Sequence, residues 1–138
     1  MMGLDLQSHG VRNLEEIDLT LEAIGRDGTQ ALTETGDPVM FTYSRHLIDF
    51  AGKTRMPAIY DNRFFVDQGG LMSYGPNLPS LHRRAAGYVD KILKGAKPAE
   101  LPFEQPSKFE LVINLKAANA LKLKVPKAML VRDDDVIR

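Results

Sequence analysis

The sequence contains no cysteine, and this absence removes several kinds of chemistry at once. Without a thiol among its 138 residues, the chain can form no disulfide, no thiolate metal site and no cysteine nucleophile. It also has no excess of either charge, because 18 basic residues balance 18 acidic ones. A neutral chain with scattered cations lacks the surface that neutralises phosphates, so we expect no nucleic-acid partner.

Long apolar runs are equally scarce. No stretch approaches the roughly 20 residues that a membrane-spanning helix needs. The first ten residues, MMGLDLQSHG, lack the basic and apolar segments of a secretory signal peptide. The sequence therefore favours a soluble chain without an export signal of its own. With 43% apolar and 26% charged residues, its length fits one globular domain over residues 1–138.

Apolar periodicity predicts that strands and helices alternate almost throughout the chain. Alternating or continuous apolar residues predict strands over residues 3–11, 29–36, 56–60, 70–74 and 108–115. Helical spacing predicts helices over residues 13–24, 37–52 and 78–95, and a short one from Asn114. The proline-rich stretch at 96–107 is expected to be extended.

Capping residues mark the starts of two of these helices. Asn13 and Glu16 form a capping box, and Asp37 precedes Pro38, which suits a first helical position. Gly52 is expected to end the second helix. This alternation is typical of βαβ units. We therefore predict an α/β fold, a three-layer sandwich around a largely parallel sheet.

Parallel sheets bind ligands beyond the carboxyl ends of their strands. The turns that qualify are TGDP at 35–38, YDNRFF at 60–65 and SYGPN at 73–77. The second is chemically the richest, because Asp61 and Asp67 flank Arg63 among aromatic rings, a mixture that suits a small zwitterionic ligand. Composition alone nevertheless favours an ordinary connection, in which Arg63 pairs with its acidic neighbours and the Phe residues enter the core.

Other motifs carry little weight. AGKT at 51–54 lacks the earlier glycine of a phosphate-binding loop and lies at a helix end. The three histidines have no metal-ligand spacing, and no serine stands in a nucleophile elbow. The acidic run at 133–135 is more typical of a solvated surface than of a cation site. We expect no catalytic residue, no metal and no cofactor.

A resemblance to a known family runs from about Gly3 to the end of the chain and is strongest over residues 55–126. PAIY is followed by GGLMSYG and then by RRAAGYVDKILKGAKPAELPFEQPSKFELVINLKAA, with a distinctive spacing of Pro and Asn. The segment resembles the C-terminal half of ABC-transporter solute-binding proteins of the tryptophan/tyrosine type. The resemblance implies one lobe of a type I periplasmic binding protein, in which two α/β lobes close on a small ligand such as an amino acid.

The same resemblance implies further expectations. The partner would be an ABC permease, and the full-length protein would be periplasmic or tethered outside the membrane. Its N-terminal lobe and signal peptide would lie outside this chain. Matched to the family's three cleft loops, the expected ligand-binding residues are Asp37 from the first, Tyr60, Asn62 and Arg63 from the second, and Gly70, Ser73 and Tyr74 from the third.

The helix over residues 78–95 would pack on that missing lobe. Its apolar residues Leu81, Tyr88 and Ile92 would then need another cover in this chain. We therefore predict a homo-oligomer that buries them by self-association through this helix.

Two alternatives from other classes remain open at this point. One is a small α/β enzyme, which would need a catalytic constellation. The other is a receiver-like signalling domain, which would need an acidic pair after its first strand, where GLDLQSHGV has none. The solute-binding interpretation is preferred over both.

Overall fold

The structure is a computed structural model that describes residues 3–131 and 134–138. Its elements are α1 (Leu14–Ile24), β1 (Leu32–Thr33), α2 (Pro38–Thr42), α3 (Ser44–Thr54), β2 (Ala58–Tyr60), α4 (Arg63–Asp67), β3 (Met72–Pro76), α5 (Leu78–Leu93), the 3-10 turn Pro98–Glu100, β4 (Phe109–Asn114), α6 (Leu115–Ala120), α7 (Lys127–Leu130) and β5 (Asp135–Ile137). No helix of this described part is long and apolar enough to cross a membrane.

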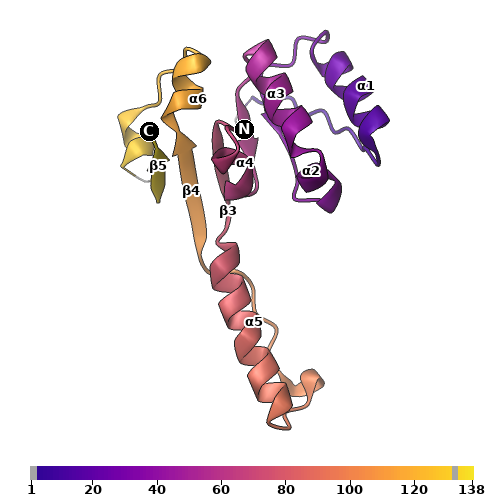
Figure 1. Cartoon of the computed structure of the whole chain (residues 1–138), viewed down its shortest axis with the longest axis vertical. Helices are drawn as coiled ribbons and strands as arrows, with labels where there is room; N and C mark the ends of the chain where they lie inside the picture. Colours follow the sequence, from indigo (N-terminus) through magenta and orange to yellow (C-terminus); the bar gives the residue numbers. More distant parts are fainter. Residues whose placement is uncertain (1–2, 132–133) are drawn as a thin grey trace.

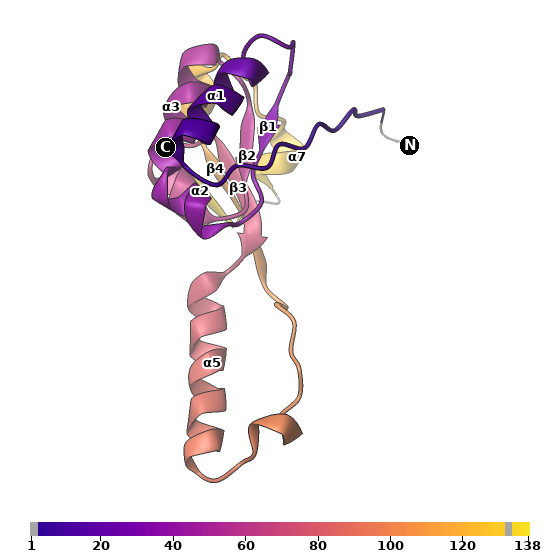
Figure 2. The ribbon, with the colours of Figure 1, turned by 90° about the vertical axis from the view of Figure 1, so that its right-hand side faces the viewer.

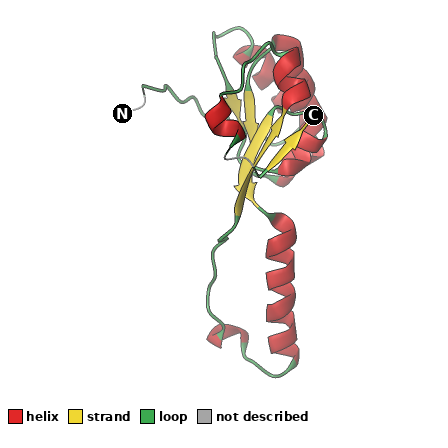
Figure 3. Cartoon of the chain, turned by 90° about the vertical axis from the view of Figure 1, so that its left-hand side faces the viewer, coloured by secondary structure: helices red, strands yellow, loops and turns green. Residues whose placement is uncertain are grey.

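The five strands form one sheet in the order β1-β2-β3-β4-β5. Figure 3 shows the strands in yellow, with helices packed beside the sheet. β1, β2 and β3 run parallel, β4 runs antiparallel to β3, and β5 is parallel to β4. The carboxyl ends of β1 to β3 therefore share one edge of the sheet with the amino ends of β4 and β5. The predicted α/β fold with a largely parallel sheet is confirmed.

The core lies where α1 and α3 pack on the sheet. These two helices lie side by side (Figure 1) and contribute Ile17 and Leu47, among others, to a buried cluster with Tyr60 and Phe65. Tyr60 and Phe65 stack with ring centroids 4.8 Å apart. β2 alternates buried, exposed, buried, so its inward residues meet the helices while Ile59 faces the opposite side.

The first predicted helix is confirmed, and the second is confirmed in part. The Asn13 side chain accepts a hydrogen bond from the Glu16 backbone N–H at 2.9 Å, as a capping box requires. Asp37 caps α2 in the same way, but the chain leaves helical geometry at Tyr43 and restarts as α3. α3 also continues past Gly52 and ends at Arg55, which takes a left-handed conformation.

The strand predicted over residues 3–11 is wrong. These residues have no regular structure and extend away from the body of the lobe (Figure 2). Leu4 and Leu6, whose alternation suggested the strand, are about four-fifths exposed. Alternating residues make a strand only where a neighbouring strand and a core face receive them, and these two leucines have neither.

Three short elements were not predicted. α4 begins where Asn62 accepts a hydrogen bond from the Phe64 N–H, inside a stretch interpreted as a loop. α7 and β5 lie in a tail without clear periodicity, and β1 covers only two residues of the predicted 29–36. Four or five residues span too little chain to show a helical period, so only tertiary packing identifies them.

α5 projects from the lobe as a long arm, and residues 94–108 return alongside it (Figures 1 and 2). The returning segment is tied to the helix by the Tyr88 hydroxyl, which donates to the Pro102 carbonyl, and by Arg84, which pairs with Glu104. Even so, no residue of α5 is buried. The predicted helix is confirmed, and its apolar side is uncovered in this chain.

We expect Phe65→Ala to lower the free energy of unfolding by about 3–5 kcal/mol, because it empties a fully buried position in the stack with Tyr60. The matched control is Phe64→Ala, since Phe64 is 39% exposed and should cost much less. Urea unfolding followed by circular dichroism measures both. Equal losses would contradict this account of the core.

Candidate ligand-binding site

Asp61, which follows β2 directly, is approached by the turn after β1 and by the end of β3. A Cβ atom built on Gly36, in the first turn, would lie 1.9 Å from Asp61 Oδ2, and one built on Gly75, in β3, would lie 1.7 Å from the Asp61 backbone oxygen. Only glycines fit at such distances. Residues at the ends of β1, β2 and β3 thus lie together at one edge of the sheet, and we call this region the carboxyl edge; most of the third predicted turn, 73–77, belongs to β3.

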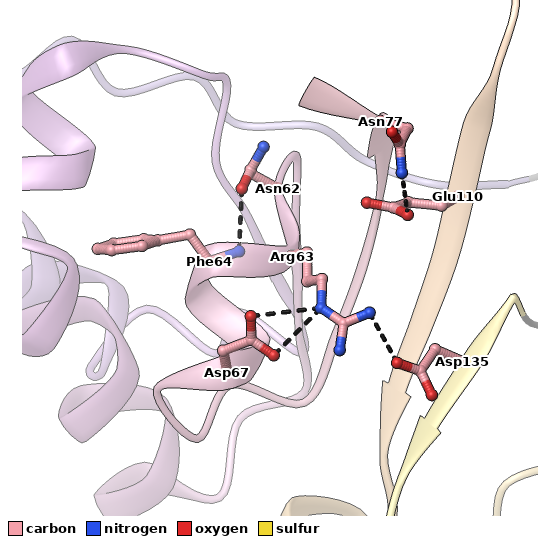
Figure 4. Close-up of polar contacts among 7 residues, drawn as sticks. All are labelled: Asn62, Arg63, Phe64, Asp67, Asn77, Glu110 and Asp135. Carbon is pink, nitrogen blue, oxygen red and sulfur yellow. Dashed lines mark hydrogen bonds and ion pairs between the residues drawn. The ribbon is translucent and has the colours of Figure 1, made fainter. Parts of the chain in front are cut away.

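Asp37 and Asn62 both cap helices at this edge. Asp37 Oδ1 accepts from the Val39 N–H at 2.7 Å, and the residue is exposed. Asn62 Oδ1 accepts from the Phe64 N–H at 2.9 Å, and the residue is 9% exposed (Figure 4). Each cap points a helix N-terminus, with its partial positive charge, towards the edge.

Arg63 is held between two carboxylates (Figure 4). Its Nη1 lies 2.6 Å from Asp135 Oδ2, and its Nε lies 3.3 Å from Asp67. The hydrogen bond to Asp135, followed by the nearby charge of Asp67, raises the pKa of Arg63 above its ordinary value. Composition alone had favoured the pairing of Arg63 with a neighbouring acid such as Asp67. The bond to Asp135 joins α4 to β5 and was not foreseen.

Tyr60 and Ser73 lie beneath this edge rather than on it. They are 2% and 1% exposed and sit side by side in the register of β2 and β3. The Tyr60 hydroxyl and Ser73 Oγ are buried without a hydrogen-bond partner among the described residues. Burial raises the pKa of Tyr60 to about 12. Both side chains therefore lie in the core beneath the carboxyl edge.

Gly70 lies at the other end of the sheet. It precedes β3, so it sits at the amino end of that strand, and its N–H donates to the Phe65 carbonyl at 2.9 Å. A Cβ there would lie 2.7 Å from a ring carbon of Tyr60. The structure therefore places Gly70 in core packing, away from Asp37 and Arg63.

Tyr74 faces the opposite side of the sheet from Ser73. It is 58% exposed and stacks on Phe109 of β4, with ring centroids 5.8 Å apart. This pair forms an open aromatic surface where the chain leaves the lobe. Nearby, Asn77 caps α5 and donates to Glu110 of β4 at 2.7 Å (Figure 4), which fixes the base of the arm.

Glu34 was missed by the sequence reasoning. It follows β1 directly and is 9% exposed, and its Oε1 accepts from the Asp61 N–H at 2.8 Å. Burial, with the neighbouring Asp61 carboxyl, raises the pKa of Glu34 to about 7. The sequence did hold a signal for this residue. If the strand alternates from Leu32, residue 34 faces inward as well, and an acidic residue is rare on a buried face.

Two hollows among the described residues lie away from this edge. A cavity of about 110 Å³ is bordered by α3, α6 and the start of β3 and includes Gly70. A groove of about 450 Å³ separates α1 from α3 and is lined by charges of both signs. Within residues 3–131 and 134–138, no three acidic or histidine side chains gather as a metal site. Asp133, the first acid of the run at 133–135, lies outside the described residues.

Comparison with protein families identifies the wider group. The sequence model of the family described as ABC transporter substrate binding protein matches residues 1–137. The chain belongs to this family. A search of the curated proteins found no match.

Solved structures agree with the substrate-binding fold. An ABC domain from Streptococcus pneumonia in complex with L-Trp is 25% identical, with a TM-score of 0.90, over 98% of this chain and 45% of that one. A conserved domain protein from Vibrio cholerae is 24% identical, with a TM-score of 0.82, over 88% of this chain and 41% of that one.

A third solved structure is the ligand-free, open form of a substrate binding protein with adhesive properties from Clostridium difficile. It is 18% identical, with a TM-score of 0.67, over 99% of this chain and 45% of that one. This chain therefore spans less than half the length of each of these three solved chains.

We expect Gly75→Ala to destabilise the protein by about 1–3 kcal/mol, because the new methyl group meets the Asp61 backbone, which cannot swing aside. Gly87→Ala is the matched control. Gly87 lies within α5 with nothing within 4 Å, so its substitution should be neutral or stabilise by up to about 1 kcal/mol. Thermal unfolding compares them, and a harmless Gly75→Ala would argue against close convergence at Asp61.

Proposed function

We propose that this chain is one lobe of the solute-binding component of an ABC uptake transporter, with its ligand held against the carboxyl edge. The observation that carries the proposal is the family match over residues 1–137, joined to the close approach of Gly36 and Gly75 to Asp61. Because matched solved chains are more than twice as long, the opposite wall of the cleft belongs to a second lobe. Residues 1–138 form a single α/β domain in this proposal.

The proposed ligand is a small organic molecule such as an amino acid. A structural neighbour at 25% identity was solved with L-Trp, which supports this class. In this chain, Arg63 Nη2 contacts no carboxylate of the described residues and can donate to a ligand carboxylate (Figure 4). Asp37 uses only Oδ1 in its cap, so Oδ2 can accept from a ligand ammonium group.

The remaining expected residues take two roles in this proposal. Asn62 and the exposed ring of Tyr74 complete the polar and aromatic surroundings of the ligand. Tyr60, Ser73 and Gly70 act from the core, by keeping β2, β3 and α4 in place. The lobe binds and releases its ligand unchanged, without catalysis, cofactor or metal.

The transport role implies a partner and a location. Closure of two lobes on the ligand would create the surface that an ABC permease recognises. The full-length protein would work in the periplasm or tethered outside the membrane.

The ligand proposal is tested by isothermal titration calorimetry on the protein as encoded, including any residues that precede Met1. L-Tryptophan, L-tyrosine and branched-chain amino acids are the probes. We expect binding of at least one, and a loss of about tenfold or more in affinity for Arg63→Met, equal to about 1.4 kcal/mol.

The control for that experiment is Arg45→Met on α3, which also removes an arginine paired with an aspartate four residues away. Arg45 lies on the groove between α1 and α3, away from the carboxyl edge, so affinity should not change. If no amino acid in the panel bound, the amino-acid assignment would fail.

We further propose that this 138-residue chain covers the apolar side of α5 with a second copy of itself. Leu81 is half-buried, whereas Val89 and Ile92 are 54% and 41% exposed. An exposed stripe along a helix that already projects from its lobe favours pairing with the same stripe of another chain.

Light scattering coupled to size exclusion tests this proposal. We expect the chain to form dimers at high concentration and Ile92→Lys to shift it towards monomer, because a buried charge without a partner is costly. Leu19→Lys, which changes an exposed leucine on α1, should leave the mass unchanged. A monodisperse monomer at every concentration would rule out pairing through α5.

A further inference from the structure

A row of buried polar groups crosses the sheet just below the carboxyl edge. One residue beyond the Thr33–Ile59 pair, Glu34 comes beside Tyr60, which pairs with Ser73. All three are at least nine-tenths buried. Their position on the inward face explains the burial, but a carboxyl group there must find a partner to offset its desolvation.

The hydrogen bonds of Glu34 account for only one of its oxygens. Oε1 accepts from the Asp61 N–H at 2.8 Å, whereas Oε2 is buried without a partner among the described residues. The same is true of Oδ1 on the Asp61 side chain. Two ionised carboxylates cannot satisfy one another, because neither has a proton to donate. One proton between them would satisfy both oxygens at once.

We propose that the carboxyl groups of Glu34 and Asp61 share one proton, and that the resulting hydrogen bond fastens the turn after β1 to the turn after β2. The geometry restricts the alternatives. Gly36 lies against Asp61 Oδ2, and the other oxygen of this carboxyl group, Oδ1, is the buried one that lacks a partner among the described residues. The proposal concerns this pair alone and does not depend on what the chain binds.

The charges around the pair do not replace this proton. Among the described residues, Asp61 is the one charged side chain that acts on the Glu34 carboxyl, and it opposes ionisation. Tyr60, from β2, is the other titratable neighbour, and its raised pKa keeps it neutral. Arg63 is engaged with Asp67 and Asp135, and Asp37 caps α2.

Loss of the proton has a defined consequence for stability. The folded protein holds a proton on Glu34 up to about pH 7, whereas the unfolded chain releases it near the ordinary value of 4.5. Between these values the folded state binds more protons, so this pair contributes less stability as pH rises. Above pH 7, two like charges would face each other under the turn that carries Asp37.

The first test is a carbon-13 NMR titration of the Glu34 side-chain carboxyl in the unaltered chain. We expect a midpoint near 7. A midpoint at the ordinary glutamate value would overturn the proposal, and this measurement needs no variant to fold.

The second test compares thermal unfolding between about pH 5 and about pH 8. Glu34→Gln carries a permanent donor in place of the shared proton, so it should lose less stability over this range than the unaltered chain. Glu22→Gln, which changes an exposed acid paired with Arg26, should keep the original pH response. If Glu34→Gln and Glu22→Gln responded to pH alike, the shared proton would be refuted.

Discussion

The close contact of Gly36 and Gly75 with Asp61 is the constraint on which the carboxyl edge depends. Gly36 and Gly75 pack against it so closely that no side chain can stand between them. This packing brings the ends of β1, β2 and β3 to a common edge. Glu34 is buried next to this contact and accepts a hydrogen bond from the Asp61 N–H.

The electrostatics of the edge follow from this packing. Acids outnumber bases there. Arg63 pairs with two aspartates, and the N-terminus of α2 receives the carboxylate of Asp37. Arg63 and Asp37 each keep one atom that can still form a hydrogen bond. Such an edge suits the reversible binding of a small polar molecule. This is the demand placed on a transport receptor, which must release its ligand unchanged.

The arm formed by α5 is fixed at its base and projects over the rest of its length. Its base is fixed to β4 through Asn77 and Glu110, and the Tyr88 hydroxyl further along it donates to the Pro102 carbonyl of the returning segment. No residue of α5 is buried, although one side of the helix is apolar. The chain covers 41–45% of the three solved chains that it matches.

The sequence by itself determined the long elements, their caps and the carboxyl-edge turns, because periodicity and capping act over neighbouring residues. Only the tertiary structure decided that residues 3–11 pair with nothing, that Gly70 lies at the far end of β3, and that Arg63 reaches Asp135. Each of these depends on which distant segments meet. The buried Glu34 is the clearest case: its charge suggests exposure, and only the packing of Asp61 above it determines its environment.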